Sequence, residues 1–305
     1  MASGKMHADE IVTDVSLVRR LLAAQFPQWT DLTLELVRSA GTDNAIYRLG
    51  DDMAVRLPRV DWAIAQVDKE QQWLPRLASH LPLAIPLPVG LGMPGEDYPW
   101  RWSIYRWLEG ETATVERLDD LSQAARELAQ FIVALQRIDA REGPPPGPHN
   151  FFRGEPLAER DEQTRSAIAS LERVLDAPAA TAAWDAALAA PLWHDPPRWI
   201  HGDLQARNLL ARNRRLSAVI DFGGLGVGDP ACDLMIAWTL FSGDSRRAFR
   251  AALAVDDATW ARGRGWALSM ALIALPYYQS TNPVIVAEAM HAINEVLADQ
   301  KAKRV

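Results

Sequence analysis

The chain has 305 residues, of which 49% are hydrophobic and 23% charged, a balance that excludes disordered and fibrous classes and leaves room for two compact lobes. Its 32 basic and 39 acidic residues give a net charge of −7, which argues against a broad nucleic-acid-binding face. Residues 1–10 lack the apolar core of a signal peptide, and the longest apolar helical region, 266–275, is too short to span a bilayer. We therefore expect a cytoplasmic protein with neither nucleic-acid nor membrane partners. The single cysteine, Cys232, excludes an internal disulfide.

The N-terminal third of the chain has the pattern of an antiparallel sheet. Strand-like segments at 32–37, 45–49 and 53–57 are separated by polar and glycine-containing turns, which predicts two successive hairpins. A helical stretch follows over 62–74, and the segment 100–107 alternates like a further strand. Between these two, a proline-punctuated segment is expected to be extended.

After a break at 108–112, the predicted elements are mostly helices. Residues 119–138 carry an apolar stripe at helical spacing, which predicts a helix packed in a large lobe. A stiff loop rich in proline and glycine occupies 141–148, and an alanine-rich helical region extends over 157–190. These segments contain no recognisable motif and no internal repeat.

A further hairpin is predicted near residue 210. The apolar segments 209–211 and 216–220 flank the polar turn 212–215, which we interpret as a solvated turn rather than an RNA contact. The six residues 223–228 are expected to form a flexible bridge because four of them are glycine. Pro230 then opens a predicted apolar helix.

The stretch from His201 to Gly223 has the composition of a phosphoryl-transfer site. Asp203 is followed five positions later by Asn208, and Asp221 begins the sequence Asp-Phe-Gly thirteen positions after that. Since a hairpin returns its chain ends to one place, Asn208 and Asp221 should offer their oxygens to the same magnesium ion, carried in with a nucleotide. Asp203 is then placed to accept the proton of an attacking hydroxyl. His201 is interpreted as a packed residue that braces this loop, because the base is already supplied.

These residues resemble the aminoglycoside phosphotransferase family. The carrying motifs are HGDLQARNLL from residue 201 and IDFGGLGVGDPACDL from residue 220. The resemblance implies an α+β, protein-kinase-like fold with two lobes: a small N-terminal antiparallel-sheet lobe over 1–107 that binds nucleotide, and a larger, mainly helical lobe over 108–305 that holds the catalytic and acceptor sites. It also implies that Asp203 is the catalytic base, that Asn208 and Asp221 are the magnesium ligands, and that Asp233 caps or braces the helix near Pro230.

The nucleotide phosphates are expected to meet the third strand and the first loop. Arg56 stands where kinase-like enzymes usually have a lysine, and its predicted partner is Glu70 in the helical stretch. Backbone amides near Gly41 and Thr42, or the Thr42 hydroxyl, could approach the phosphates from above. Taken alone, that loop would be an ordinary turn, and Arg56 and Glu70 unrelated surface charges.

The purine is expected to bind at the joint between the lobes. By the resemblance, backbone groups of Arg106 and Leu108 should bond the purine edge, and the choice between ATP and GTP stays open. A buried edge strand ending in a loop would have the same sequence pattern without any nucleotide.

The acceptor is expected to be small. A protein kinase needs a long segment after its metal-binding Asp to dock a peptide, and here only the short bridge precedes Pro230; we expect no protein substrate. An aminoglycoside is the first candidate and a macrolide the second. The alternatives are a metabolic kinase for choline, a homoserine-like compound or a sugar, and a non-catalytic nucleotide-binding module. The tryptophans are interpreted as core residues, and the acceptor contacts stay unassigned.

Overall fold

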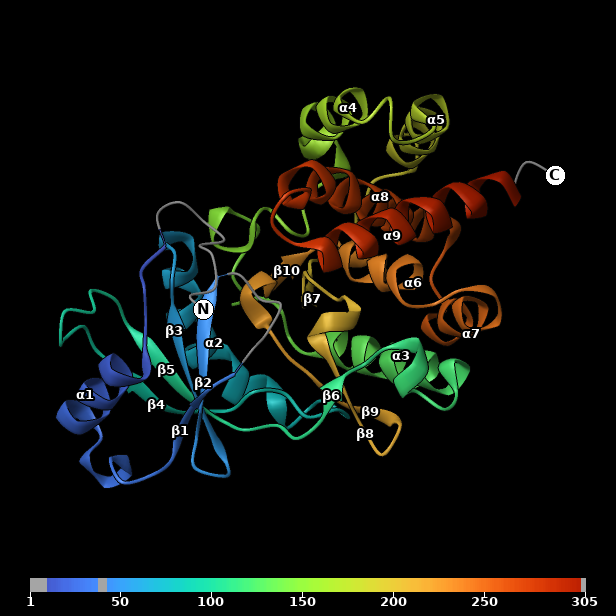
Figure 1. The fold of residues 1–305 in the computed structure, drawn as a ribbon. Coiled ribbons are helices and arrows are strands. Elements are labelled where there is room, and N and C mark those ends of the chain that lie inside the picture. Colours follow the sequence, from blue (N-terminus) through green and yellow to red (C-terminus); the bar gives the residue numbers. More distant parts are fainter. Residues whose placement is uncertain (1–9, 38–42, 303–305) are drawn as a thin grey trace. The chain divides into compact units, whose positions relative to one another are not determined.

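The computed structural model describes residues 10–37 and 43–302 (Figure 1). Contacts divide the chain into two compact units. Unit 1 comprises Met1–Gly110 together with Ala218–Gly223, and unit 2 comprises Glu111–Ser217 together with Gly224–Val305. Among the helices in the described part of the chain, none is long and apolar enough to cross a membrane.

Unit 1 contains an antiparallel sheet with the strand order β1-β2-β3-β5-β4. Its strands are β1 (Leu34–Leu36), β2 (Asn44–Leu49), β3 (Met53–Pro58), β4 (Pro88–Gly92) and β5 (Trp102–Arg106). The predicted hairpins are confirmed, since β2 lies between β1 and β3 and pairs with both. Gly50 opens the β2–β3 turn with φ +59, a left-handed conformation that glycine adopts without strain.

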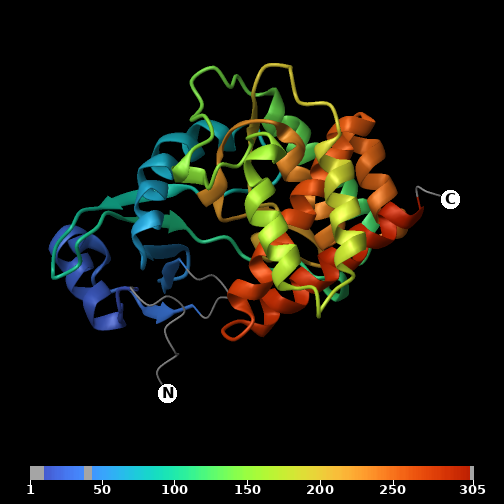
Figure 2. The ribbon, with the colours of Figure 1, turned by 90° about the horizontal axis from the view of Figure 1, so that it is seen from above.

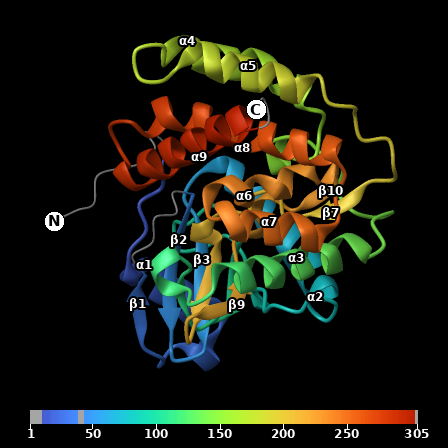
Figure 3. The same ribbon diagram turned by 90° about the vertical axis from the view of Figure 1, so that its right-hand side faces the viewer.

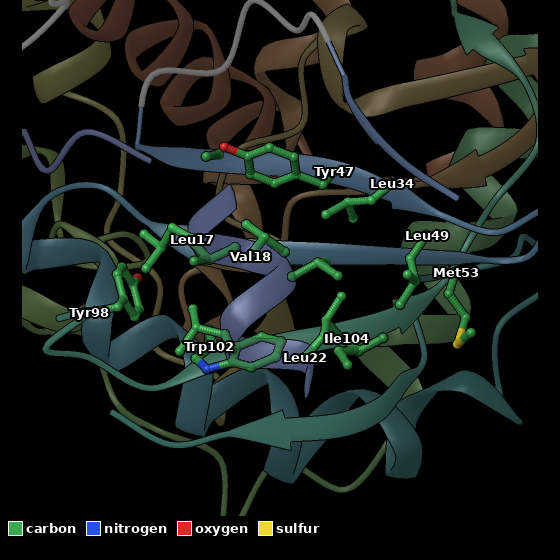
Figure 4. Packing of buried hydrophobic residues seen from close by; sticks show 14 residues of the cluster. Leu17, Val18, Leu22, Leu34, Tyr47, Leu49, Met53, Tyr98, Trp102 and Ile104 are labelled. Carbon is green, nitrogen blue, oxygen red and sulfur yellow. The ribbon is translucent and has the colours of Figure 1, made fainter. Parts of the chain in front are cut away.

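One face of this sheet is covered by α1 (Val15–Gln25), a helix that the sequence analysis did not anticipate. Figure 4 shows Leu17, Val18 and Leu22 of α1 in one cluster with Tyr47, Leu49 and Trp102 of the sheet. Alternation along the strands directs these residues to the same side. Asp14 caps the helix by accepting a hydrogen bond of 2.7 Å from the Leu17 N–H.

The other face of the sheet meets α2 (Ile64–Ala78). This helix extends the predicted 62–74 segment at its C-terminal end, and it begins after a short 3₁₀ turn at Asp61–Ala63. Polar side chains of α2 reach Arg56 on β3 and Tyr105 on β5. Because Arg56 and Tyr105 alternate with the residues that face α1, a polar cluster lies on the side of the sheet opposite the apolar core.

The hairpin predicted near residue 210 is also confirmed. Strand β8 (Leu209–Arg212) lies between β9 (Arg215–Val219) and the short β6 (Glu111–Thr112). The two turn residues, Asn213 and Arg214, have φ of 52 and 61, as in the two-residue turns that suit the twist of a hairpin. Arg214 pairs with Asp119, in keeping with a solvated turn.

The flexible bridge predicted at 223–228 is wrong. Gly223 and Gly224 lie in a buried 3₁₀ turn at Phe222–Gly224. Residues Gly226–Gly228 form β10, a buried strand that pairs with β7 (Arg198–Ile200). A Cβ atom on Gly228 would lie 2.6 Å from the Gly154 carbonyl oxygen. These glycines therefore allow two backbones to pack closely. Their number, which suggested a flexible segment, reflects this close packing.

The rest of unit 2 is helical. Its helices are α3 (Leu121–Arg137), α4 (Asp161–Ser170), α5 (Ala177–Leu188), α6 (Ile236–Thr239), α7 (Gly243–Leu253), α8 (Asp257–Tyr278) and α9 (Pro283–Ala302). Helix α3 packs against α7 and β7, while α4 and α5 lie beside α8 (Figures 2 and 3). The side chains of Trp238, Trp260 and Trp266 are buried, as predicted for core residues.

Two helical predictions in unit 2 need correction. The alanine-rich region is interrupted between α4 and α5, where Asp176 caps α5 by accepting from the Ala179 N–H at 3.0 Å. The expected helix after Pro230 is instead a 3₁₀ helix at Pro230–Met235, followed by the single turn of α6. Asp229 caps the 3₁₀ helix through the Ala231 N–H.

Candidate active site

The loop from His201 to Asn208 connects β7 to β8 in unit 2. Gly202 has φ +82, and a Cβ atom there would lie 2.3 Å from the Gly224 carbonyl oxygen. Only glycine fits this position. The His201 side chain is fully buried, and its Nδ1 accepts a hydrogen bond of 3.2 Å from the Asp203 N–H. His201 therefore braces the loop, as the sequence analysis expected.

Asp233 supports this loop. The sequence analysis instead expected it to cap or brace the helix near Pro230. Its two carboxylate oxygens accept hydrogen bonds from the backbone N–H groups of His201 (2.8 Å) and Gly202 (2.7 Å). The residue that caps the helix after Pro230 is Asp229 instead. Burial raises the pKa of Asp233, and His201 and the two amides oppose that rise. Asp233 is thus a buried support of the loop that carries Asp203.

The Asp203 carboxylate lies among hydrogen-bond donors. Gln205 donates to Oδ1 at 2.5 Å and Asn208 donates to Oδ2 at 3.0 Å. The guanidinium groups of Arg207 and Arg153 lie 3.6 and 3.9 Å from its oxygens. Burial alone would raise the pKa of Asp203, but these two cations hold it below its usual value. The side chain is therefore an ionised carboxylate in a fixed orientation.

Arg153 is a site residue that the sequence analysis missed. Its side chain is buried, and its Nε donates a hydrogen bond of 2.8 Å to the Gly202 carbonyl oxygen. Burial lowers the pKa of its guanidinium. Arg153 follows the proline-rich loop and belongs to no motif. Because Gly202 is distant in sequence, no local pattern indicated the contact between them.

Arg207 connects the loop to the C-terminal helix of unit 2. Its Nη1 contacts Gln205 at 2.6 Å and Glu288 of α9 at 3.1 Å. Because Arg207 also lies near Asp203, one guanidinium links Glu288 of α9 to the Asp203 carboxylate. This arrangement was not foreseen from the sequence either.

Asn208 is oriented as a metal ligand should be. Its Nδ2 donates to the main-chain oxygen of Asp203 at 2.8 Å and to the Asp203 carboxylate. With the amide nitrogen committed to Asp203, the amide oxygen faces the other way and presents a hard donor. Such an oxygen suits magnesium.

Asp221 belongs to unit 1, and its carboxylate also fits a magnesium ligand. Its backbone has φ 63, a strained conformation for a residue other than glycine. The side chain is 48% exposed, and its Oδ1 lies 3.1 Å from the Arg56 Nη2. An accessible carboxylate oxygen on a strained turn is a typical feature of a functional site.

The predicted ion pair between Arg56 and Glu70 is present in unit 1. The Arg56 Nη1 lies 2.7 Å from both Glu70 oxygens, and Tyr105 donates a further short hydrogen bond to Glu70. Burial disfavours the charge of Arg56, yet Glu70 and Asp221 together raise its pKa above the usual value. The guanidinium therefore stays charged and points toward the Asp221 carboxylate.

The remaining predicted nucleotide contacts are placed in part. Gly41 and Thr42 lie outside the described residues. Arg106 ends β5, and its N–H donates to the Leu87 carbonyl oxygen at 2.8 Å, so a purine contact at this residue would have to use its carbonyl oxygen. Leu108 follows in the loop after β5. Their contacts with a purine stay predictions.

Comparison with known structures shows a shared fold. A GDP and kanamycin complex of APH(2")-IIia has a TM-score of 0.73 and 20% identity, with 92% of this chain and 98% of that chain covered. A macrolide 2'-phosphotransferase, MphH from Brachybacterium faecium, has a TM-score of 0.61 and 23% identity, with 92% and 98% covered. These likenesses confirm the predicted α+β, protein-kinase-like fold. No curated protein matches the sequence.

The sequence itself matches a family model described as the phosphotransferase enzyme family over residues 36–266. The match includes the third strand, the ion-paired helix, the loop with Asp203 and Asn208, and the Asp-Phe-Gly turn. It confirms the resemblance drawn from the two motifs. The chain belongs to the phosphotransferase enzyme family.

Proposed function

We propose that this phosphotransferase moves the terminal phosphate of ATP or GTP to a hydroxyl of a small natural product, an aminoglycoside first and a macrolide second. The observation that carries the proposal is the arrangement at Asp203. Its ionised carboxylate is fixed by Gln205 and Asn208 and lies beside two arginines. A fixed carboxylate can accept a hydroxyl proton and hold the hydroxyl in line with a phosphate.

In this proposal Asn208 and Asp221 hold Mg²⁺ with their side-chain oxygens. The metal would neutralise charge that develops on the phosphate oxygens. The chain supplies the orientation. Asn208 is turned by its bonds to Asp203, and Asp221 is presented by its strained turn.

Arg56 is proposed to bind phosphate oxygens of the nucleotide. Because Glu70 holds Nη1 and Gln66 accepts from Nη2 at 3.2 Å, the guanidinium plane is fixed before the nucleotide arrives. The Arg106 carbonyl oxygen and the Leu108 N–H are proposed for the purine, and Gly41 and Thr42 for the phosphates. Residues 1–107 would thus bind the nucleotide, and 108–305 would supply the base and the acceptor site.

The acceptor class is proposed from the segment after Asp221. Residues 226–228 form a buried strand, so no long peptide-docking segment separates Asp221 from Pro230. The related structures include a kanamycin complex and a macrolide phosphotransferase. A net charge of −7 favours a cationic acceptor.

The test is phosphate transfer from labelled ATP and GTP to a panel of aminoglycosides, macrolides, choline, homoserine and sugars. Transfer to an antibiotic is expected, and Asp203→Ala should lower turnover by at least about 10²-fold with nucleotide affinity kept. Transfer only to a metabolite would move the chain to the metabolic kinases. Nucleotide binding without transfer to any acceptor would make it a non-catalytic module. Unchanged turnover in Asp203→Ala would refute the assigned base.

A further inference from the structure

Lys69 is an unusual cation in this chain. The sequence has 28 arginines and only four lysines, and Lys69 is the sole lysine between residues 6 and 300. It is also buried, with 8% of its surface exposed. Burying an ammonium group costs free energy, because desolvation disfavours the charge. At this buried position the chain has a lysine, although nearly all its other basic residues are arginines.

The Lys69 amine contacts the turn at residues 221–223, which we call the metal loop because Asp221 is the proposed magnesium ligand. Its Nζ donates a hydrogen bond of 2.7 Å to the carbonyl oxygen of Gly223, two residues after Asp221. Both residues belong to unit 1. An amine on a four-carbon stem can reach a single carbonyl in a tight space, whereas a planar guanidinium needs room for several donors.

Three side chains on one face of α2 act on this loop and on Arg56. Gln66, Lys69 and Glu70 are spaced i, i+3 and i+4, which places them on the same side of the helix. The Gln66 amide packs so closely on Gly223 that a Cβ atom there would lie 2.9 Å from it. Gln66 and Glu70 also accept hydrogen bonds from Arg56. The helix therefore holds the phosphate-binding arginine and the metal loop together.

The loop is fixed at both ends. Before Asp221, the Val219 N–H donates to the Ala84 carbonyl oxygen at 2.9 Å. After Asp221, Lys69 holds Gly223. Between these anchors Asp221 has φ 63, a conformation that costs on the order of 1 kcal/mol and persists only where the surroundings enforce it. Removing the anchor at Gly223 would release the turn.

We propose that Lys69 is a positioning residue that orients the Asp221 carboxylate toward magnesium by holding the Gly223 carbonyl. The inference rests on the proposed function, in which Asp221 is a magnesium ligand. Lys69 makes no contact with the metal in this proposal. It sets the backbone from which the ligand projects.

The test compares Lys69→Met with Lys69→Arg and with Asp68→Asn in the full chain. Methionine keeps the apolar stem and loses the donor. Arginine keeps the charge and the hydrogen-bond donors, so it should keep part of the support of the Gly223 carbonyl. Asp68 is a matched control, because it is the neighbouring residue on α2 and forms an exposed ion pair with Arg101.

The readout is ATP and GTP affinity measured calorimetrically with and without Mg²⁺, together with the Mg²⁺ concentration that gives half-maximal transfer. Lys69→Met should bind metal-free nucleotide normally and lose about tenfold or more in apparent Mg²⁺ affinity, as expected when a support of a metal ligand is removed. The apparent Mg²⁺ affinity of Lys69→Arg should lie between those of the wild type and Lys69→Met, and that of Asp68→Asn should match the wild type.

Two results would overturn the inference: an unchanged Mg²⁺ dependence in folded Lys69→Met, or an equal loss with and without Mg²⁺, which would indicate a purely structural role. Asp221→Asn, measured in parallel, separates this failure from failure of the proposed function. If Asp221→Asn also leaves the Mg²⁺ dependence unchanged, the ligand assignment itself is wrong and the inference falls with it.

Discussion

One oxygen of the Asp233 carboxylate accepts a hydrogen bond of 2.7 Å from the backbone N–H of Gly202. The other oxygen accepts from the N–H of His201 at 2.8 Å. All three residues are buried, so the two amides have no water to replace this partner. The carboxylate fixes the backbone immediately before Asp203, and the position of the proposed base depends on it.

Asp233→Asn should therefore destabilise the loop, even though asparagine has nearly the same shape as aspartate. An amide can accept from one N–H, but its NH₂ group would face the other N–H, which leaves a buried donor unpaired at a cost of about 1–3 kcal/mol. We expect lower stability in urea unfolding and at least about tenfold lower turnover. Asp244→Asn, at a residue whose side chain is 82% exposed, is the control. Wild-type stability and turnover in Asp233→Asn would contradict the assigned role.

Asp229 and Arg262 form a buried ion pair in unit 2, with Nε and Oδ2 2.7 Å apart. Asp229→Ala should lower the free energy of unfolding by about 3–5 kcal/mol, because it leaves an unpaired buried guanidinium. The double variant with Arg262→Met should recover part of this loss. Urea unfolding of the single and double variants measures both. A double variant less stable than Asp229→Ala would show that the pair is not the source of the loss.

The sequence predicted those parts of the fold and site that depend on neighbouring residues. The β8–β9 hairpin follows from two apolar runs around a polar turn, and the ion pair of Arg56 with Glu70 was expected from the family resemblance. Burial of Trp238, Trp260 and Trp266 also followed from their helical spacing, whereas Trp62 is 40% exposed. In each case the signal lies within a short window of the chain.

The parts that could not be predicted depend on partners distant in sequence. Gly226–Gly228 pairs with residues 198–200, and its glycines resemble a flexible linker until Gly154 is placed beside them. Asp233 bonds amides some thirty residues earlier in the chain, so a local interpretation assigned it to the nearest helix. Arg153 and Glu288 reach the loop from His201 to Asn208 from segments without a motif.

The stability of the wild type and of Lys69→Met should diverge as pH rises. Burial lowers the pKa of Lys69 to about 8 from its usual value of 10.5. Between these values the unfolded chain binds a proton at Lys69 that the folded chain has released, so the free-energy cost of burying this group falls as pH rises. Below pH 8 both states are protonated, and its contribution does not change.

Urea unfolding of both proteins from pH 7 to 9.5 checks this. The difference in unfolding free energy should be constant up to about pH 8 and then rise in favour of the wild type by at most about 1.4 kcal/mol per pH unit. Using the difference removes the titrations that the two proteins share, including that of Cys232, whose pKa burial raises. A difference independent of pH would mean that the pKa of Lys69 is not lowered in the fold.

Phe151 and Phe152 have φ of 54 and 58, and both side chains are exposed, by 40% and 46%. A left-handed backbone costs a residue with a Cβ atom about 1–2 kcal/mol relative to glycine. Phe→Gly at either position should therefore be more stable than Phe→Ala by about 1 kcal/mol, since both substitutions remove the ring and only glycine relieves the strain. At Gln130, an exposed position inside α3, the order should reverse, because glycine is the poorer helix former. Thermal unfolding of the three Gly and Ala pairs measures this, and alanine variants as stable as the glycine variants at 151 and 152 would show that the turn stores no strain.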